Sequence, residues 1–290
     1  MIKLNFERDV IIMALYNMKE LLDDAQRKQY GIGYFNAVNM EMVRAYISAA
    51  EEAESPIIIG TAEALLDIAS FDWIVPLMID QAKNAKVPVA IHLDHTYHFD
   101  TLMQALRAGF GSIMYDGSRE THEQNTENSK RIVDIAHAMG ASVECELGSV
   151  GGLSDETGGE DITEYTNPNE AKAFIEKTGA DFLAVSIGTA HGVYESTPKL
   201  DLERLGMIRE TVDVPLVLHG GSGLSDEDFQ GTIANGITKI NVFTDIISAA
   251  ADALTKNSGV SYLEGLQLAE AAMKRETLRK MTVFGSVGRA

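Results

Sequence analysis

Residues 88–100, PVAIHLDHTYHFD, decide the fold prediction for this chain. Their first half is apolar and β-prone, whereas His92, Asp94 and His95 crowd into the second half. An apolar run that is too short for a helix and opens into ionisable residues is typical of a buried strand carrying chemistry at its C-terminal end. Alternate side chains of a strand face opposite ways, so we expect His92 and Asp94 on one face and His95 where the strand gives way to a loop. Asp94 and His95 then form either an acid/base group beside a metal ligand, or a pair of buried, hydrogen-bonded polar residues.

The alternation of short apolar runs and helical segments continues along the whole chain. Besides the opening stretch, strands are expected at residues 31–38, 56–61, 112–117, 142–148, 182–188, 215–221 and 239–245. Helices are expected at residues 18–30, 41–53, 73–84, 99–108, 123–139, 168–178, 201–211, 226–234, 246–256 and 262–281. Strand cores rich in Val, Ile and Leu without strict alternation are buried on both faces, and repeated strand–helix units form a parallel sheet.

We therefore predict the α/β class, with a single (β/α)₈ TIM barrel and extra terminal helices. The length of 290 residues suits two domains or one large barrel, and no Pro/Gly/Ser-rich linker divides the chain. Residues 1–17 are interpreted as an N-terminal extension and residues 18–290 as the barrel.

Composition narrows the function classes. The net charge of −19 argues against a nucleic-acid partner, which needs a basic surface, but still allows a small phosphorylated substrate held by backbone amides. No run approaches the ~18 apolar residues of a membrane span, and the N-terminus lacks signal-peptide features. The single cysteine, Cys145, excludes an intrachain disulfide. We expect a cytoplasmic protein with no nucleic-acid or membrane partner.

The barrel prediction places chemistry at the C-terminal ends of the strands. Nearly every expected strand ends in a polar or ionisable residue: Asn36, Thr61, Asp94 with His95, Asp116, Glu146, His191, His219 and Asn241. Three histidines that converge on one mouth would make a catalytic Zn²⁺ site, which keeps three protein ligands and one open position. The alternative is that each histidine is an ordinary hydrogen-bonded polar residue.

Two glycine-rich stretches indicate a phosphate site. GTAHG spans residues 188–192 and HGGSG spans residues 219–223. Glycines at a barrel mouth let backbone amides approach an anion, and the last βα loops of such barrels often hold phosphate. The candidates are Gly192, Gly220, Ser222 and Thr244. Tight βα turns also favour glycine, so this pattern has a purely structural interpretation as well.

The stretch 149–165, SVGGLSDETGGEDITEY, is long for a βα connection. We interpret it as a glycine- and acid-rich loop that could close over the site as a lid. Asp155 and Glu156 are its candidate proton-transfer groups. A simply solvated acidic loop is the alternative.

Six ordered motifs resemble the class II (zinc-dependent) ketose-bisphosphate aldolases, which include fructose- and tagatose-bisphosphate aldolases. The motifs are HLDH, YDGS, VECELG, GTAHG, VLHGGSG and KINVFTD, and the likeness runs from about Met18 to the C-terminus. The family fold is a (β/α)₈ barrel, in agreement with the prediction made from the strand–helix pattern.

The resemblance implies roles for individual residues. It implies zinc ligands at His95, His191 and His219, with Asp94 as the acid/base carboxylate. It also implies a second or alternative cation position at Asp116 and Glu146. The phosphate of dihydroxyacetone phosphate would be bound by Gly192, Gly220, Ser222 and Thr244. Asn241 would contact the enediolate of dihydroxyacetone phosphate, and Asn36 is a further candidate for substrate binding.

The resemblance also implies partners and chemistry. Members often bind a monovalent cation (Na⁺ or K⁺) near the phosphate loops, and they form homodimers or homotetramers. Their reaction is aldol cleavage or formation of a ketose phosphate, a carbon–carbon (aldehyde) lyase activity of carbohydrate metabolism on a small-molecule sugar phosphate.

Several positions depart from the family pattern. Phe243 stands where fructose-bisphosphate aldolases usually have Asp and the tagatose branch often has Ala, so it is a candidate specificity residue. Leu153 and Ser154 follow the glycines where the family commonly has Glu, and no arginine for a second phosphate occurs in residues 246–259. These departures put binding of a second substrate phosphate in question more than the aldolase chemistry. They are compatible with a ketose substrate that carries a single phosphate.

Two other functions stay open. One is a non-catalytic sugar-phosphate-binding or stabilising subunit on the same barrel. The other is a zinc hydrolase with a metal-bound hydroxide as nucleophile.

Overall fold

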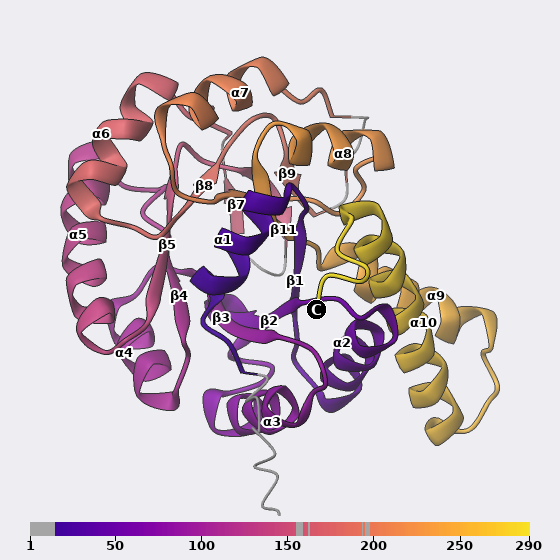
Figure 1. Cartoon of the computed structure of the whole chain (residues 1–290). Helices are drawn as coiled ribbons and strands as arrows, with labels where there is room; N and C mark the ends of the chain where they lie inside the picture. The colour runs from indigo at the N-terminus through magenta and orange to yellow at the C-terminus, as the bar shows by residue number, and fades with distance from the viewer. Residues whose placement is uncertain (1–14, 155–158, 162, 193, 195–197) are drawn as a thin grey trace, which may run out of the picture.

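The computed structural model describes residues 15–154, 159–161, 163–192, 194 and 198–290. Eight parallel strands close a barrel in the order β1-β11-β10-β8-β5-β4-β3-β2, which confirms the predicted TIM barrel (Figure 1). The barrel strands are β1 (Ile32–Asn36), β2 (Ile57–Ala62), β3 (Val89–Thr96), β4 (Ser112–Tyr115), β5 (Ser142–Leu147), β8 (Phe182–Val185), β10 (Leu216–Leu218) and β11 (Ile237–Asn241).

Helices surround the barrel on the outside (Figure 1). They are α2 (Met40–Ala53), α3 (Phe71–Asn84), α4 (Phe99–Ala108), α5 (His122–Ala138), α6 (Pro168–Thr178), α7 (Leu202–Thr211) and α8 (Asp226–Ala234), and a short 3₁₀ turn, η1 (Glu63–Leu65), precedes α3. Local signals explain where several begin: Thr121 and Ser225 form capping boxes at the starts of α5 and α8. The observed helix bounds lie within two residues of those expected for α2 to α8, whereas β8, β10 and β11 end at Val185, Leu218 and Asn241, before the expected ends at residues 188, 221 and 245.

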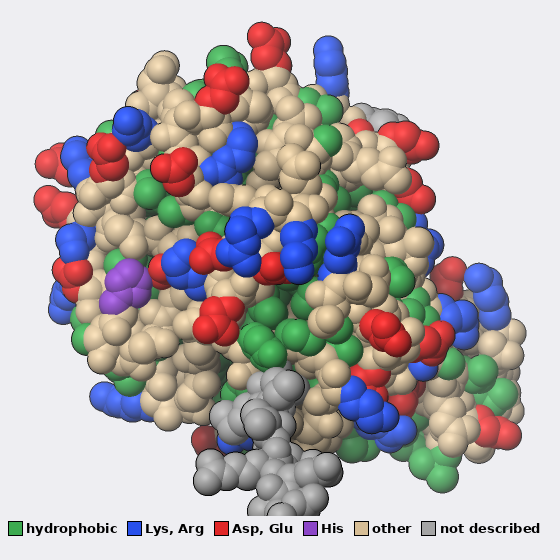
Figure 2. Space-filling view, in the orientation of Figure 1, with side chains coloured by type: hydrophobic (Ala, Val, Ile, Leu, Met, Phe, Trp, Pro, Cys, Tyr) green, Lys and Arg blue, Asp and Glu red, His purple; other side chains and the backbone are tan. Residues whose placement is uncertain are grey.

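Helix α1 (Met18–Lys28) closes the N-terminal end of the barrel. Its buried face, which includes Met18 and Leu22, packs with Ile32, Ile58 and Ala90 from the beginnings of the strands. Figure 1 shows α1 lying across the near end of the barrel, and Figure 2 shows basic and acidic side chains interleaved over the same face. The C-terminal ends of the strands, where the sequence predicts the site, therefore lie at the opposite end of the barrel. Residues 1–14 lie outside the described part of the chain, and Tyr16 already donates its amide to Val89 O.

The two C-terminal helices, α9 (Thr244–Lys256) after the eighth barrel strand and the extra terminal helix α10 (Tyr262–Phe284), form a hairpin that projects from the barrel (Figure 1). Helix α10 also packs along α2. It runs to Phe284, past the expected end at residue 281, because Phe284 is buried and Gly285 ends the helix in the left-handed region. Within the described residues, no helix has the length and apolar character needed to cross a membrane.

The stretch 149–165 differs from the expected loop. It contains β6 (Gly151–Ser154) and β7 (Gly159–Asp161), which pair in antiparallel fashion, and β6 also pairs with β9 (Ala190–His191). Pairing on both sides of β6 satisfies backbone N–H and C=O groups that a loop would leave to solvent. The composition of this stretch alone does not indicate such pairing. The candidate lid residues Asp155 and Glu156 lie outside the described residues.

Candidate active site

Strand β3 brings two adjacent ionisable side chains to the mouth of the barrel. It continues to Thr96, beyond the point where we expected a loop, but its pairing with β4 shifts register between Leu93 and Thr96. His95 lies in this irregularity with a φ of 30°, in the left-handed region that non-glycine residues rarely adopt. Neighbours in a regular strand point to opposite faces, so this bulge explains how Asp94 and His95 both reach the site.

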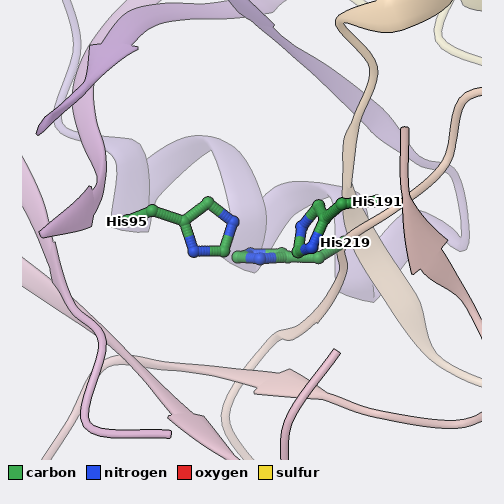
Figure 3. Close-up of side chains that lie close together, drawn as sticks. All are labelled: His95, His191 and His219. Atoms are coloured by element: carbon green, nitrogen blue, oxygen red, sulfur yellow. The ribbon is translucent and has the colours of Figure 1, made fainter. Parts of the chain in front are cut away.

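Three histidines from distant parts of the chain meet at this mouth. They are His95 on β3, His191 on β9 and His219 just after β10 (Figure 3). One nitrogen of each lies within 4.8 Å of the other two. The structure thus brings together the three residues that the sequence singled out as metal ligands.

The hydrogen bonds of these imidazoles leave a consistent set of nitrogens for a metal. His95 Nδ1 lies 2.8 Å from Asp116 Oδ2, and His219 Nε2 lies 2.8 Å from Glu144 Oε1. His95 Nε2, His219 Nδ1 and both nitrogens of His191 are buried without a hydrogen-bond partner among the described residues. Buried polar atoms are rarely left unpaired, and a carboxylate on the far nitrogen is how proteins orient metal-binding histidines. The residues present fit a divalent cation.

The ionisation of two of the three rings suits metal binding, whereas the third ring holds a proton. Burial lowers the pKa of His191 well below its usual value, and burial lowers that of His219 as well. Neutral imidazole is the form that ligates metals. Burial opposes protonation of His95, but the carboxylates of Asp94 and Asp116 outweigh it and raise the pKa of His95 to about 10. In the metal-free protein, His95 therefore carries a proton that a metal ion has to displace.

Asp94 lies beside the three histidines and is held as a carboxylate. Asn241 Nδ2 donates a hydrogen bond to Asp94 Oδ2 at 2.8 Å, and Lys239 Nζ lies 3.6 Å from Oδ1. Burial disfavours the charged form, but the charges of Lys239 and His95 outweigh it and keep the pKa of Asp94 well below its usual range. An ionised carboxylate beside a metal position can accept a proton from a substrate hydroxyl.

A buried ion pair crosses the barrel beneath Asp94. Lys239 Nζ lies 2.9 Å from Glu144 Oε2, and His92 Nε2 lies 3.5 Å from the same oxygen. His92, Asp94 and Glu144 have the spacing of a second metal-binding group. The ammonium of Lys239 already supplies a positive charge to both carboxylates there, so we interpret this group as an internally compensated network rather than a metal site.

The sequence analysis missed Glu144 and Lys239, although a signal for each was present. Glu144 lies two residues from Glu146 in β5, and Lys239 lies two residues from Asn241 in β11. Alternation in a strand places each pair on one face, so the predicted site residues point to these two as neighbours. What alternation does not reveal is that the two charged residues face each other across the barrel.

Asp116 and Glu146 lie next to the histidines, as a second cation position would require. One ligand atom from each, together with one from His95, lies within 4.8 Å of the others. Burial and the neighbouring charge of Asp116 raise the pKa of Glu146 well above its usual value. The role of Asp116 and Glu146 in binding a second cation stays a prediction.

Comparison with known proteins identifies the family. Residues 16–289 match the family described as class-II fructose-bisphosphate aldolase. The chain belongs to this family.

Individual relatives agree with this assignment. The fructose-bisphosphate aldolase of Geobacillus stearothermophilus is 39% identical over 286 residues, covering 96% of this chain and 99% of that protein. A protein named uncharacterized protein YdjI, from Escherichia coli (strain K12), is 41% identical over 271 residues, covering 92% of this chain and 96% of that protein. The crystal structure of the YdjI aldolase from Escherichia coli K12 matches with a TM-score of 0.87 at 37% identity, covering 95% of this chain and 99% of that chain. Membership supports aldolase activity, that is, breaking or forming a carbon–carbon bond.

The candidate phosphate-binding residues of this class II aldolase lie on neighbouring loops at the barrel mouth. Gly192 and Gly220 directly follow the ligand candidates His191 and His219, and both have positive φ values, 86° and 66°. Ser222 Oγ accepts a hydrogen bond from the amide of Asp245 at 3.2 Å, which places it at the N-terminus of α9, where Thr244 is the first residue. A helix N-terminus beside glycine-rich loops is a common anion site.

The other two candidates are buried near the strand ends. Asn36 ends β1, and its Oδ1 accepts a hydrogen bond from Tyr34 Oη at 2.6 Å. Phe243 precedes α9, is 5% exposed and belongs to the main hydrophobic core of the aldolase.

Proposed function

We propose that this protein is a zinc-dependent aldolase that cleaves or forms a ketose phosphate, with dihydroxyacetone phosphate and an aldehyde as the two halves. The observation that carries the proposal is the convergence of His95, His191 and His219 beside the ionised Asp94, with ring nitrogens that have no hydrogen-bond partner among the described residues. The resemblance of the motifs to class II ketose-bisphosphate aldolases supports the same reaction.

The three imidazoles would hold the metal ion. A set of three histidines with an open fourth position favours zinc over cations that prefer oxygen ligands. When bound, zinc supplies Lewis-acid stabilisation of the negative charge that develops on the ketone oxygen.

Asp94 performs the proton transfer. In cleavage its carboxylate takes the proton of the C4 hydroxyl, and in condensation it returns a proton to the aldehyde oxygen. Asn241 Nδ2 donates to Oδ2 of Asp94 at 2.8 Å, and Lys239 Nζ and His92 Nε2 each lie 3.6 Å from Oδ1, so both oxygens have fixed neighbours beside the histidines. Asn241 Oδ1 has no partner among the described residues, and it would lie against the enediolate that cleavage leaves.

The substrate is a small sugar phosphate of the fructose- or tagatose-bisphosphate type, with one phosphate sufficient for binding. Gly192, Gly220, Ser222 and Thr244 would hold the phosphate of the dihydroxyacetone phosphate half, with a monovalent cation nearby. Anchoring the phosphate keeps the reacting carbons in place. The absence of arginine from residues 246–259 supports a single phosphate.

We further propose that the protein acts in the cytoplasm as a homodimer or homotetramer. The single buried cysteine, Cys145, suits a reducing compartment. Apolar side chains exposed on α9 and α10 support self-association.

The central test replaces Asp94 with Asn, which keeps the shape of the side chain and removes its charge. Cleavage of a panel of ketose mono- and bisphosphates should fall on the order of 10²–10⁴-fold while zinc content is unchanged, because the ligands remain. Asp100→Asn, at an exposed position on α4, is the matched control. Unchanged turnover in D94N would refute the assigned role. Release of dihydroxyacetone phosphate, followed with a coupled dehydrogenase, separates an aldolase from a hydrolase and from a non-catalytic binder.

A further inference from the structure

The hydroxyl of Tyr194 touches the backbone on both sides of the histidine cluster. Tyr194 Oη accepts a hydrogen bond from the amide of Ala190 at 2.9 Å and donates one to the carbonyl of Gly220 at 2.7 Å. Ala190 immediately precedes His191, and Gly220 immediately follows His219. One hydroxyl thus joins two ligand-bearing segments that come from different elements.

The two segments are in close contact where Tyr194 joins them. A Cβ placed on Gly220 would lie 2.5 Å from the carbonyl oxygen of Ala190. The ring of Tyr194 also packs on Gly223, where an added Cβ would lie 3.0 Å from the ring. The backbones at Ala190 and Gly220 therefore cannot move closer together, and the hydroxyl bridge keeps them from moving apart.

His191 depends on this bridge more than the other two histidines do. Asp116 and Glu144 orient His95 and His219 through hydrogen bonds, whereas neither nitrogen of His191 has a hydrogen-bond partner within the described chain. Its ring orientation therefore rests on the backbone around residue 191. That backbone lies in the short β9, outside the barrel, and is secured by β6 on one side and by Tyr194 on the other.

The hydroxyl keeps the proton that the bridge needs. Burial raises the pKa of Tyr194 to about 12, so the side chain stays a neutral donor to Gly220 at physiological pH.

We propose that Tyr194 is a positioning residue for the metal site: by bridging Ala190 and Gly220 it holds His191 and His219 at the spacing a divalent ion requires. This inference rests on the proposed zinc site. Tyr194 acts through the backbone and takes no part in the chemical step.

Tyr194→Phe removes only the hydroxyl and tests the proposal directly. Zinc affinity, measured by competition with a chromophoric chelator, should fall about 10- to 100-fold, the usual effect of removing a group that orients a metal ligand. Zinc loss to excess chelator should be correspondingly faster. At saturating zinc, kcat should return close to the wild-type value, which a general structural defect would not allow.

Tyr30→Phe is the matched control. Tyr30 Oη donates to Asp24 Oδ2 at 3.1 Å, at the barrel end that α1 closes, so this variant also loses one tyrosine hydrogen bond but leaves the mouth untouched. It should keep wild-type zinc affinity. Equal zinc affinity in Y194F and wild type, or equal losses in Y194F and Y30F, would overturn the inference. Failure of the wild type itself to bind zinc would instead contradict the proposed function.

Discussion

At the level of single residues, His95 combines backbone strain with an unusual charge state. Its φ of 30° and its contact with Asp116 both follow from the bulge in β3. Strain of this kind persists only where the surroundings determine the conformation strongly, and it is commonly found at functional sites. Here the strain turns His95 toward the same side as Asp94.

The raised pKa of His95 predicts that zinc binding releases a proton. Its pKa in the metal-free protein is about 10, above the ordinary value of 6.5, so its proton stabilises the fold fully below about pH 6.5, and this stabilisation is lost as the pH rises through about 10. At pH 8 the His95 ring is protonated, while His191 and His219 have lowered pKa values and are neutral. Zinc titration by calorimetry at pH 8, in buffers of different ionisation enthalpy, should therefore show release of about one proton, and affinity should weaken as the pH falls. Binding heats that do not depend on the buffer would argue against this ionisation state.

At the level of elements, α1 supplies stability without touching the chemistry. Leu22 is fully buried in the small core between α1 and the beginnings of the strands, and the histidines lie at the other end of the barrel. The inner space of a barrel is a packed core, so an element that fills one end contributes to stability even when the site lies at the other.

Leu22→Ala should lower the free energy of unfolding by about 2–5 kcal/mol through lost burial and a cavity, measured by denaturant titration. Turnover at temperatures where the variant is folded should match the wild type. Lys19→Ala on the same helix removes only a partly exposed ion pair with Asp23 and should change stability by less than about 1 kcal/mol. A large fall in turnover of folded L22A would show that α1 influences the mouth of the barrel.

At the level of the whole molecule, the α9–α10 hairpin projects from the barrel and carries exposed apolar side chains (Figure 1). Leu254, Tyr262 and Leu263 are 44%, 78% and 69% exposed, and Figure 2 shows hydrophobic side chains on this projection at the lower right. Apolar side chains gathered on a projection are typical of an interaction surface.

Analytical ultracentrifugation should give the mass of two or four chains. The double variant Tyr262→Ser and Leu263→Ser should shift the protein toward smaller species, because it removes apolar area that association would bury. Ile68→Ser, at a site 68% exposed but distant from the hairpin in sequence, is the control and should not change the mass. A wild-type protein that sediments as a single chain would contradict the proposed oligomer.

The local sequence determined the barrel and most of its mouth. Buried strands rich in Val, Ile and Leu, amphipathic helices between them and polar residues at strand ends were enough to predict the architecture and to select Asp94, His95, His191 and His219. The alternation of strands and helices carries this information because the C-terminal ends of all strands in a parallel barrel lie at the same rim. A residue at a strand end therefore lies at the site whichever strands flank it. The pairing of β6 with β7 and β9, by contrast, was predicted as a loop, because pairing partners are not encoded in the composition of one segment.

Only the tertiary structure decided which side chains complete the site. Glu144 and Lys239 meet across the barrel, and Tyr194 bridges Ala190 to Gly220, over separations that no local pattern encodes. The bulge that turns His95 toward Asp94 likewise arises from the register between β3 and β4. The physical reason is that hydrogen bonds and charge compensation in a closed barrel depend on strand register and on loop contacts, which are set only when all eight strands pair.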